Sequence, residues 1–262
     1  MDLRLSGKKA IVSGSTAGIG LAAAQTLAAE GADVVLNGRS PARVDAAVQQ
    51  IRAALPKARV SGVAADLATP AGAEALRAAV PEADILINNL GIFDPKPFDQ
   101  ISDEEWTRFF EVNVLSGVRL SRAYLPGMLN RNWGRIVFVS SESGINIPSE
   151  MIHYGMTKTA QLAVSRGLAE LTKGTAVTVN SVLPGPTKSE GVEEFVDKLS
   201  AGKPFDQLEQ EFFNSVRPAS LLRRFATVEE IASLIAYVCS PLAAATNGAA
   251  LRCDGGIVHT IV

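Results

Sequence analysis

A tyrosine and a lysine four residues apart are the residues of this sequence best suited to acid–base chemistry. Tyr154 and Lys158 stand at i and i+4, so a helix would place the ammonium group beside the phenol. A phenol has a pKa near ~10, and a neighbouring cation lowers such a value by roughly 1 to 3 units. The pattern therefore predicts a group that exchanges a proton near neutral pH, although the same spacing also occurs on solvated helix faces.

Ser141 lies thirteen residues before Tyr154, just after an apolar run at 135–139. Such a run is typical of a buried strand, which would put the serine hydroxyl at the carboxyl end of that strand. Ligands bind at this edge of open α/β sheets. We therefore expect Ser141 to belong to the same site as the tyrosine and the lysine.

A glycine-rich segment near the start of the chain has the order of strand, loop and helix that a phosphate site requires. Residues 8–13 form a short apolar run, and residues 13–20 read SGSTAGIG before an alanine- and leucine-rich helical pattern that extends to Glu30. Glycines let the backbone approach a pyrophosphate, and a helix N-terminus offers free N–H groups and a positive dipole. The spacing is G-x-x-x-G-x-G rather than the commoner G-x-G-x-x-G, and a plain tight turn is the alternative interpretation.

The next two predicted strands, at 33–37 and 59–64, are followed by polar residues that are suited to binding an adenosine. Arg39 stands where an acidic residue would bind the 2′-hydroxyl of NAD(H), and an arginine there pairs with a 2′-phosphate, which favours NADP(H). Its alternative role is to cap an exposed turn. Asp66, followed by Leu67, would accept a hydrogen bond from the adenine amino group or help to cap a helix that starts near Thr69.

Three asparagines follow or interrupt apolar segments. Asn88 and Asn89 come directly after an apolar run at 85–87, where they would bond backbone and ligand or simply form a turn. Asn113 is a polar residue inside an apolar stretch of a long helical pattern that begins at Ser102. Because a buried asparagine needs partners, it would bond backbone at a kink or hold a water beside the active site.

Composition excludes several classes of protein. With 262 residues and 47% apolar content, the chain can bury a sizeable core, and we expect one domain. The net charge of −2 and the even spread of Lys and Arg do not suggest binding to nucleic acid or to an anionic membrane. No apolar run reaches ~18 residues and no signal-peptide pattern is present, so we expect a cytoplasmic protein. The two histidines form no ligand cluster, so no metal site is predicted.

The stretch at 190–217 is the least regular part of the sequence. It mixes charged residues with phenylalanines and comes soon after a predicted strand that ends near the site. A long excursion beside a site suggests a lid over the substrate. A pair of ordinary amphipathic helices is the alternative, and both interpretations can hold together.

Together these motifs resemble the short-chain dehydrogenase/reductase family, over essentially the whole chain. The matching patterns are SGSTAGIG at 13–20, NNLG at 88–91, Asn113, Ser141 with Tyr154 and Lys158, and PGPTKS at 184–189. The resemblance, closest to the single-domain 3-oxoacyl reductases, implies one α/β domain over residues 1–262. Its Rossmann-type, doubly wound sheet would have about seven parallel strands with helices on both faces. It also implies a nicotinamide cofactor and assembly as a homodimer or homotetramer.

The resemblance assigns roles to these residues. Tyr154 would be the general acid/base, and Ser141 would orient the substrate oxygen. Lys158 would bond the nicotinamide ribose and lower the pKa of the phenol, and Asn113 would hold a water in a proton relay through this lysine. The residues expected to contact the cofactor, from pattern or from resemblance, are Gly14, Ser15, Thr16, Gly18, Ile19, Gly20, Arg39, Asp66, Leu67, Asn89, Gly91, Tyr154, Lys158, Pro184, Gly185, Thr187 and Ser189.

Three positions depart from the family pattern. Ser13 and Ser189 replace threonines, which keeps both hydroxyls. Leu90 replaces a small alanine, so a cofactor contact there would be altered. None of these changes removes a catalytic group.

The sequence thus predicts an NADP(H)-dependent oxidoreductase, with NAD(H) as the alternative cofactor, that interconverts a ketone and a secondary alcohol. The nicotinamide would exchange a hydride with the carbonyl carbon while Tyr154 exchanges a proton with its oxygen. A 3-oxoacyl thioester or related β-keto compound is the favoured substrate, and sugars, polyols, steroids and small ketones stay open. An isomerase or dehydratase using the same tyrosine, and a non-catalytic cofactor-binding protein, are the alternative functions.

Overall fold

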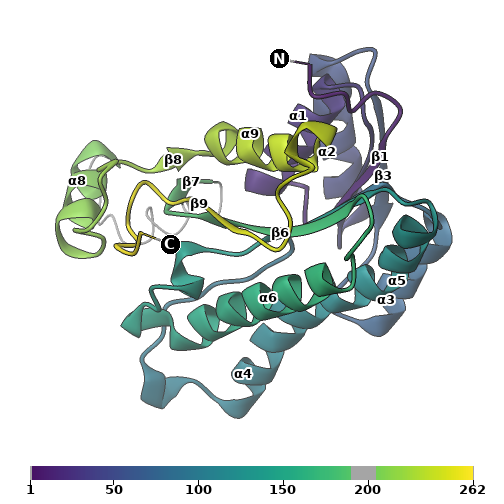
Figure 1. Cartoon of the computed structure of the whole chain (residues 1–262). Coiled ribbons are helices and arrows are strands. Elements are labelled where there is room, and N and C mark those ends of the chain that lie inside the picture. The colour runs from purple at the N-terminus through teal and green to yellow at the C-terminus, as the bar shows by residue number, and fades with distance from the viewer. Residues whose placement is uncertain (1, 190–204, 262) are drawn as a thin grey trace.

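A seven-stranded parallel sheet forms the centre of the molecule (Figure 1). The computed structural model describes residues 2–189 and 205–261. The strand order is β3-β2-β1-β4-β5-β6-β9, so the direction of winding reverses between β1 and β4. The strands are β1 (Lys9–Val12), β2 (Asp33–Gly38), β3 (Arg59–Ala64), β4 (Ile85–Asn88), β5 (Gly134–Val139), β6 (Val177–Pro184) and β9 (Ala250–Cys253). The predicted doubly wound sheet is confirmed.

Helices cover both faces of the sheet (Figure 1). One face carries α1 (Gly18–Ala29), α2 (Pro41–Ala54) and α9 (Val228–Cys239), and the other carries α3 (Pro70–Ala79), α5 (Ser116–Asn130) and α6 (Ile152–Glu170). Successive residues of a strand point to opposite faces. Accordingly, Ile85 and Ile87 pack in the core beneath α1 and α9, whereas Leu86 packs in the core beneath α3 and α5. Both cores exclude water, which fixes the register of the central strands.

The long helix expected from Ser102 is interrupted. The helix α4 (Asp103–Phe110) begins with a capping box between Ser102 and Glu105, and a π-helical turn at Glu111–Leu115 joins it to α5. Asn113 lies in that turn and bonds to a segment outside the helix, which gives a physical reason for the break. Turns of this kind are frequent at functional sites.

A small subdomain lies beyond the carboxyl edge of the sheet. It contains α8 (Phe205–Ser215) and a short parallel pair of strands, β7 (Thr187–Lys188) and β8 (Ala226–Thr227). Its core is a phenylalanine cluster built on Phe213 and Phe225. Of the stretch predicted to be a lid, residues 190–204 lie outside the described residues and 205–215 form this helix, so the lid itself stays a prediction.

The described ranges contain neither a membrane-spanning helix nor a cluster of metal ligands. No helix within 2–189 or 205–261 combines the length and the apolar character needed to cross a membrane. Nor do three or more His, Cys, Asp or Glu side chains of those ranges come together as a metal ion would require. Cys239 is buried and Cys253 half-buried, and both are free thiols.

Candidate active site

A cavity of about 540 Å³ lies at the carboxyl edge of the central strands. One part of its wall comes from the glycine loop before α1, and the opposite part from α6 and the segment after β5. The predicted site residues that line it are Gly18, Ile19, Asn89, Gly91, Ser141, Tyr154, Lys158, Pro184, Gly185, Thr187 and Ser189. The fold therefore brings the two halves of the predicted site to one place.

The helix α6 holds Tyr154 and Lys158 on the side that faces this cavity. The Lys158 Nζ lies 5.5 Å from the centroid of the Tyr154 ring. Strand β5 ends at Val139, and Ser141 follows it as a buried hydrogen-bonding partner of the phenol. Three of the four predicted catalytic side chains thus converge on one point of the cavity wall.

The pKa of Tyr154 is raised above its usual value. Burial of the phenol is the main cause, and the Glu142 carboxylate adds to it, whereas hydrogen bonding with Ser141 and the charge of Arg217 act in the opposite direction. The expectation that Lys158 lowers this pKa is not met in this structure, because the loss of water around the phenol dominates. Tyr154 is therefore protonated at neutral pH, the form that can give a proton to a carbonyl oxygen.

Lys158 is a buried cation held by neutral acceptors. Its Nζ donates to the Val139 carbonyl at 2.9 Å and to the Gln161 Oε1 at 3.3 Å. Burial lowers the pKa of Lys158 to about 7. The Gln161 Nε2 in turn donates to the Asn113 carbonyl, so one amide joins the lysine to the π-helical turn. Gln161 was not predicted as a site residue, and its only signal was a polar side chain three positions after the lysine.

Asn113 uses its side chain to hold the backbone that follows β4. Its Oδ1 accepts from the Ile92 N–H at 2.8 Å, and its Nδ2 donates to the Ile92 carbonyl at 3.0 Å and to the Thr157 Oγ1 at 2.9 Å. Of the two predicted roles, bonding to backbone at a break in the helix is the one found. The role in a water relay stays a prediction.

The loop before α1 fits a pyrophosphate. Gly14 and Gly18 have φ values of 59° and 57°, a region that favours glycine. A Cβ on Gly20 would lie 2.5 Å from the Asn89 Nδ2, so only glycine allows this close approach. The first residue before the helix, Ala17, offers no side-chain cap, which leaves the N–H groups of the first turn to an anion. The fold family implies a nicotinamide cofactor, and these residues would hold its phosphates.

Several residues predicted to contact the cofactor support the loop. The Asn89 Nδ2 donates to the Ser13 and Gly14 carbonyls at 3.1 and 2.9 Å. Ser15 is fully buried, with its Oγ donating to the Val12 carbonyl at 2.7 Å. Thr16 lies against Gly38 at the end of β2.

The predicted adenosine residues lie on the turns after β2 and β3. Arg39 is exposed on the first turn. Asp66 is exposed on the second, where its carboxylate accepts from the Ala68 N–H at 3.2 Å, and Thr69 rather than Asp66 caps α3. Leu67 is 1% exposed and packs in the core, so its contact with the cofactor stays a prediction.

Most of the chain matches one known protein family. Residues 8–200 match the family model described as short chain dehydrogenase. The chain belongs to the short-chain dehydrogenase family. As a member of this family it is an NAD(P)-dependent oxidoreductase.

Among similar short-chain dehydrogenases is the uncharacterized oxidoreductase YvaG of Bacillus subtilis (strain 168), which is 48% identical over 263 residues and covers 100% of both chains. D-beta-hydroxybutyrate dehydrogenase of Cupriavidus necator is 34% identical, over 97% of this chain and 99% of the relative. The crystal structure of L-sorbose reductase from Gluconobacter frateurii, complexed with NADPH and L-sorbose, matches 100% of both chains with a TM-score of 0.92 at 33% identity.

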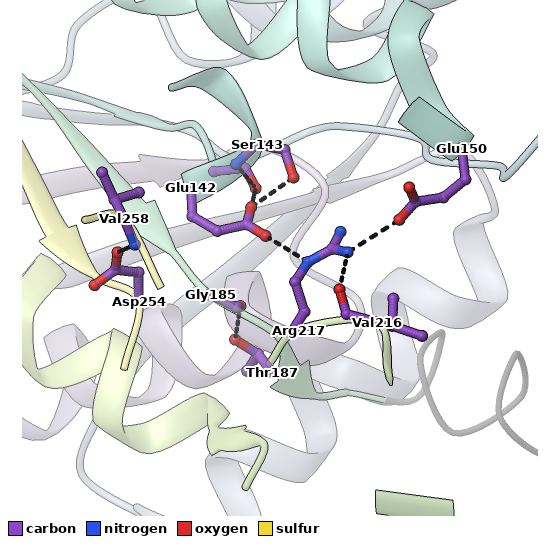
Figure 2. A network of polar contacts seen from close by, with 10 residues as sticks. Glu142, Ser143, Glu150, Gly185, Thr187, Val216, Arg217, Asp254 and Val258 are labelled. Carbon is purple, nitrogen blue, oxygen red and sulfur yellow. Dashed lines mark hydrogen bonds and ion pairs between the residues drawn. The ribbon is translucent and has the colours of Figure 1, made fainter. Parts of the chain in front are cut away.

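Three charged side chains that the sequence did not single out also line the cavity (Figure 2). The Glu142 Oε2 accepts from the Ser141 Oγ at 2.6 Å and from the Ser143 Oγ, and its Oε1 accepts from the Arg217 Nε at 3.2 Å. The Arg217 Nη1 also donates to the Glu150 Oε1 at 3.0 Å. The only available signals were that Glu142 directly follows the predicted catalytic serine and that Arg217 ends the predicted lid stretch.

Proposed function

We propose that this protein is an NADP(H)-dependent reductase that interconverts a ketone and a secondary alcohol, with Tyr154 as general acid/base. The convergence of Tyr154, Ser141 and Lys158 at one end of a cavity that begins at a phosphate cradle carries this proposal. When bound, the nicotinamide would supply the hydride. Tyr154 would give its proton to the carbonyl oxygen, which Ser141 orients, and would take the proton back in the reverse reaction.

The preference for NADP(H) is part of this proposal. Arg39 lies exposed on the turn after β2, where a 2′-phosphate would meet its guanidinium, and a similar reductase was crystallised with NADPH. The Lys158 ammonium would bond the nicotinamide ribose, and Asn113 would take part in proton supply through this lysine. The segment 184–189 would contact the nicotinamide end, since five of its residues line the cavity that also holds Ser141.

The substrate in this proposal is a small ketone or its alcohol. A 3-oxoacyl thioester or related β-keto compound is one candidate from the sequence. The L-sorbose bound to a similar reductase adds a ketose as a second candidate. An isomerase or dehydratase of the same fold would convert its substrate without net consumption of NADPH.

The test is NADPH oxidation by the purified protein with a panel of carbonyl compounds: acetoacetyl-CoA, a diketone, L-sorbose and cyclohexanone. Tyr154→Phe is measured beside the wild type. We expect the variant to lose about 10²- to 10⁴-fold in kcat, the usual contribution of a general acid. Its NADPH affinity, read by fluorescence titration, should fall far less than its kcat, because Tyr154 is one of many predicted cofactor contacts. Equal turnover by the two proteins would rule out this role for the tyrosine.

We further propose that the protein is cytoplasmic and forms a homodimer or homotetramer. The outer face of α6 carries small residues, including Ala160 and Gly167, and the exposed Leu171 directly follows the helix. Leu171 is 63% exposed, and a Cβ on Gly167 would meet no atom within 4 Å. This face has room for a second helix at close range. Light scattering that finds only the mass of one chain would contradict the assembly.

A further inference from the structure

The Glu142–Arg217–Glu150 network is the charged part of a cavity end that is otherwise mainly apolar. The apolar residues around it are Phe93, Met151, Phe212, Val216 and Phe225. The side chains of Arg217 and Glu142 are only 11% and 5% exposed. Burying charges in this way costs free energy, and a buried pair is often no more stable than an apolar one. The position of the network beside Ser141 therefore calls for an explanation in terms of what enters the cavity.

The network begins at the group that would orient the substrate oxygen. Ser141 donates its hydroxyl proton to Glu142 at 2.6 Å, and a bound ketone would draw this proton to its own oxygen by rotation of the hydroxyl, which frees one acceptor position of the carboxylate. Arg217 lies on the other oxygen of the same carboxylate (Figure 2). A ketone whose oxygen meets Ser141 and Tyr154 places its next carbon within reach of Glu142. A hydroxyl on that carbon can donate to the carboxylate, which offers about four acceptor positions and is already bonded by Ser141, Ser143 and Arg217. Hydroxyls further along the substrate would meet Arg217 and Glu150.

The charge of the network argues against an anionic substrate. One guanidinium is shared by the carboxylates of Glu142 and Glu150, so the network has one surplus negative charge. A substrate carboxylate beside Arg217 would also face both glutamates and be repelled.

An apolar substrate fits this end of the cavity no better. Its chain would cover the charged groups without replacing the water that they lose, which is costly. A neutral hydroxylated substrate has no such cost, because each hydroxyl donates to a carboxylate or accepts from the guanidinium.

We propose that the Glu142–Arg217–Glu150 network is a substrate-recognition site that selects neutral polyhydroxylated ketones. Glu142 and Arg217 bind the hydroxyls nearest the carbonyl group. Glu150, whose side chain is 41% exposed, is the outer member and discriminates against substrates that carry a carboxylate. This inference rests on the proposed reductase function and narrows its substrate class.

The first measurement compares ketones that are matched in carbon count. D-fructose and L-sorbose are neutral and hydroxylated, 5-ketogluconate adds a carboxylate, and 2-hexanone has no hydroxyl group. NADPH oxidation by the wild type should give the highest kcat/KM with one of the neutral ketohexoses. We expect kcat/KM for 2-hexanone to be about 10- to 100-fold lower, because this ketone offers the charged groups no hydrogen bonds in place of those they make to water.

Variants test whether the network is responsible. Arg217→Met should lower kcat/KM for the ketohexose relative to that for 2-hexanone by roughly 10- to 100-fold, chiefly through the KM of the ketohexose. Any effect of the lost charge on Tyr154 is common to both substrates and cancels in this ratio. Glu150→Gln removes the outer negative charge from a half-exposed position that tolerates change. It should raise kcat/KM for 5-ketogluconate relative to that for the ketohexose by about 2- to 5-fold. The matched control is Arg77→Met, which removes an exposed arginine paired with Glu74 on α3, away from the cavity, and should change neither ratio.

The outcomes separate this inference from the reductase function. Better turnover of 2-hexanone, acetoacetyl-CoA or 5-ketogluconate than of either ketohexose would overturn the recognition site and leave the reductase intact. Unchanged substrate ratios in both network variants would do the same. If NADPH binds but none of these ketones causes its oxidation, both proposals are wrong.

Discussion

The side-chain oxygen of Gln161 accepts a hydrogen bond from the Lys158 ammonium at 3.3 Å, inside the buried face of α6. Burial lowers the pKa of Lys158 to about 7. The hydrogen-bond acceptors around its ammonium group therefore determine the pH up to which this group stays charged. Replacing the amide by an apolar side chain removes one of them. We expect Gln161→Leu to lower the pKa of Lys158 by about one further unit, since a hydrogen bond to a charged group is worth about 1.5–3 kcal/mol.

The measurement is the pH profile of kcat/KM for NADPH. If the charged lysine is required, activity should fall on the alkaline side at a lower pH in Gln161→Leu than in the wild type. Gln161→Glu is the matched variant, because a carboxylate beside the ammonium raises its pKa and should move the same limb to higher pH. Identical alkaline limbs in all three proteins would show that Gln161 does not control the charge of Lys158.

The same buried lysine makes folding stability depend on pH. The folded pKa of Lys158 is about 7, below its value of about 10.4 in an unfolded chain. Between these values the unfolded chain binds more protons, so stability should rise with pH, by about 2 kcal/mol between pH 7 and pH 9. Tyr154, whose pKa is raised, titrates above this window. Urea unfolding at the two pH values should show the rise in the wild type and lose most of it in Lys158→Met; an equal rise in both proteins would mean that another group causes it.

The fold could be predicted from the sequence because its signals are local. The apolar runs at 8–13, 85–87 and 135–139 correspond to β1, β4 and β5, and the helical pattern expected to extend to Glu30 is α1, which ends at Ala29. The helix expected to continue through Asn113 is broken because this side chain bonds to Ile92, which is 21 residues away. A periodic pattern contains no information about such a contact.

The candidate site could be predicted only in part, because only some of its contacts are between residues close in the sequence. Tyr154 and Lys158 are neighbours by helical spacing alone, so the sequence places them together. Arg217 and Glu142 are 75 residues apart, and their pairing depends on how the segment after α8 packs on the sheet edge. The raised pKa of Tyr154 depends on burial, which spacing does not reveal.

Cofactor preference can be tested at Arg39. Arg39→Ala should weaken NADPH binding by roughly 10- to 100-fold, the loss of a charge-assisted contact to a 2′-phosphate, and leave NADH binding unchanged. The measurement is the Kd of each cofactor by fluorescence titration. Arg59→Ala is the control. This exposed arginine is the first residue of β3 and so lies at the amino ends of the strands, whereas Arg39 follows the carboxyl end of β2. A ratio of NADPH to NADH affinity that Arg39→Ala leaves unchanged would contradict the assignment of NADP(H).

The phosphate cradle can be tested at Gly20. A Cβ there would lie 2.5 Å from the Asn89 Nδ2 and 2.6 Å from the Gly14 carbonyl oxygen, two atoms that are hydrogen-bonded to each other at 2.9 Å. The methyl group of Gly20→Ala must therefore break or displace the contact that closes the loop. Overpacking of this kind costs about 1–3 kcal/mol, so the urea midpoint and the NADPH affinity should both fall.

The matched control for Gly20 is Gly167→Ala, in the middle of α6. A Cβ on Gly167 meets no atom of the same chain within 4 Å, so this change should leave NADPH binding as it is. Comparing the two variants separates the general effect of adding a methyl group to a helix from its effect on the loop, since both glycines are helical and only Gly20 touches the loop. If Gly20→Ala bound NADPH as tightly as Gly167→Ala, the Asn89 contact would not be needed to shape the loop, and the phosphates would have to be held by the N-terminus of α1 alone.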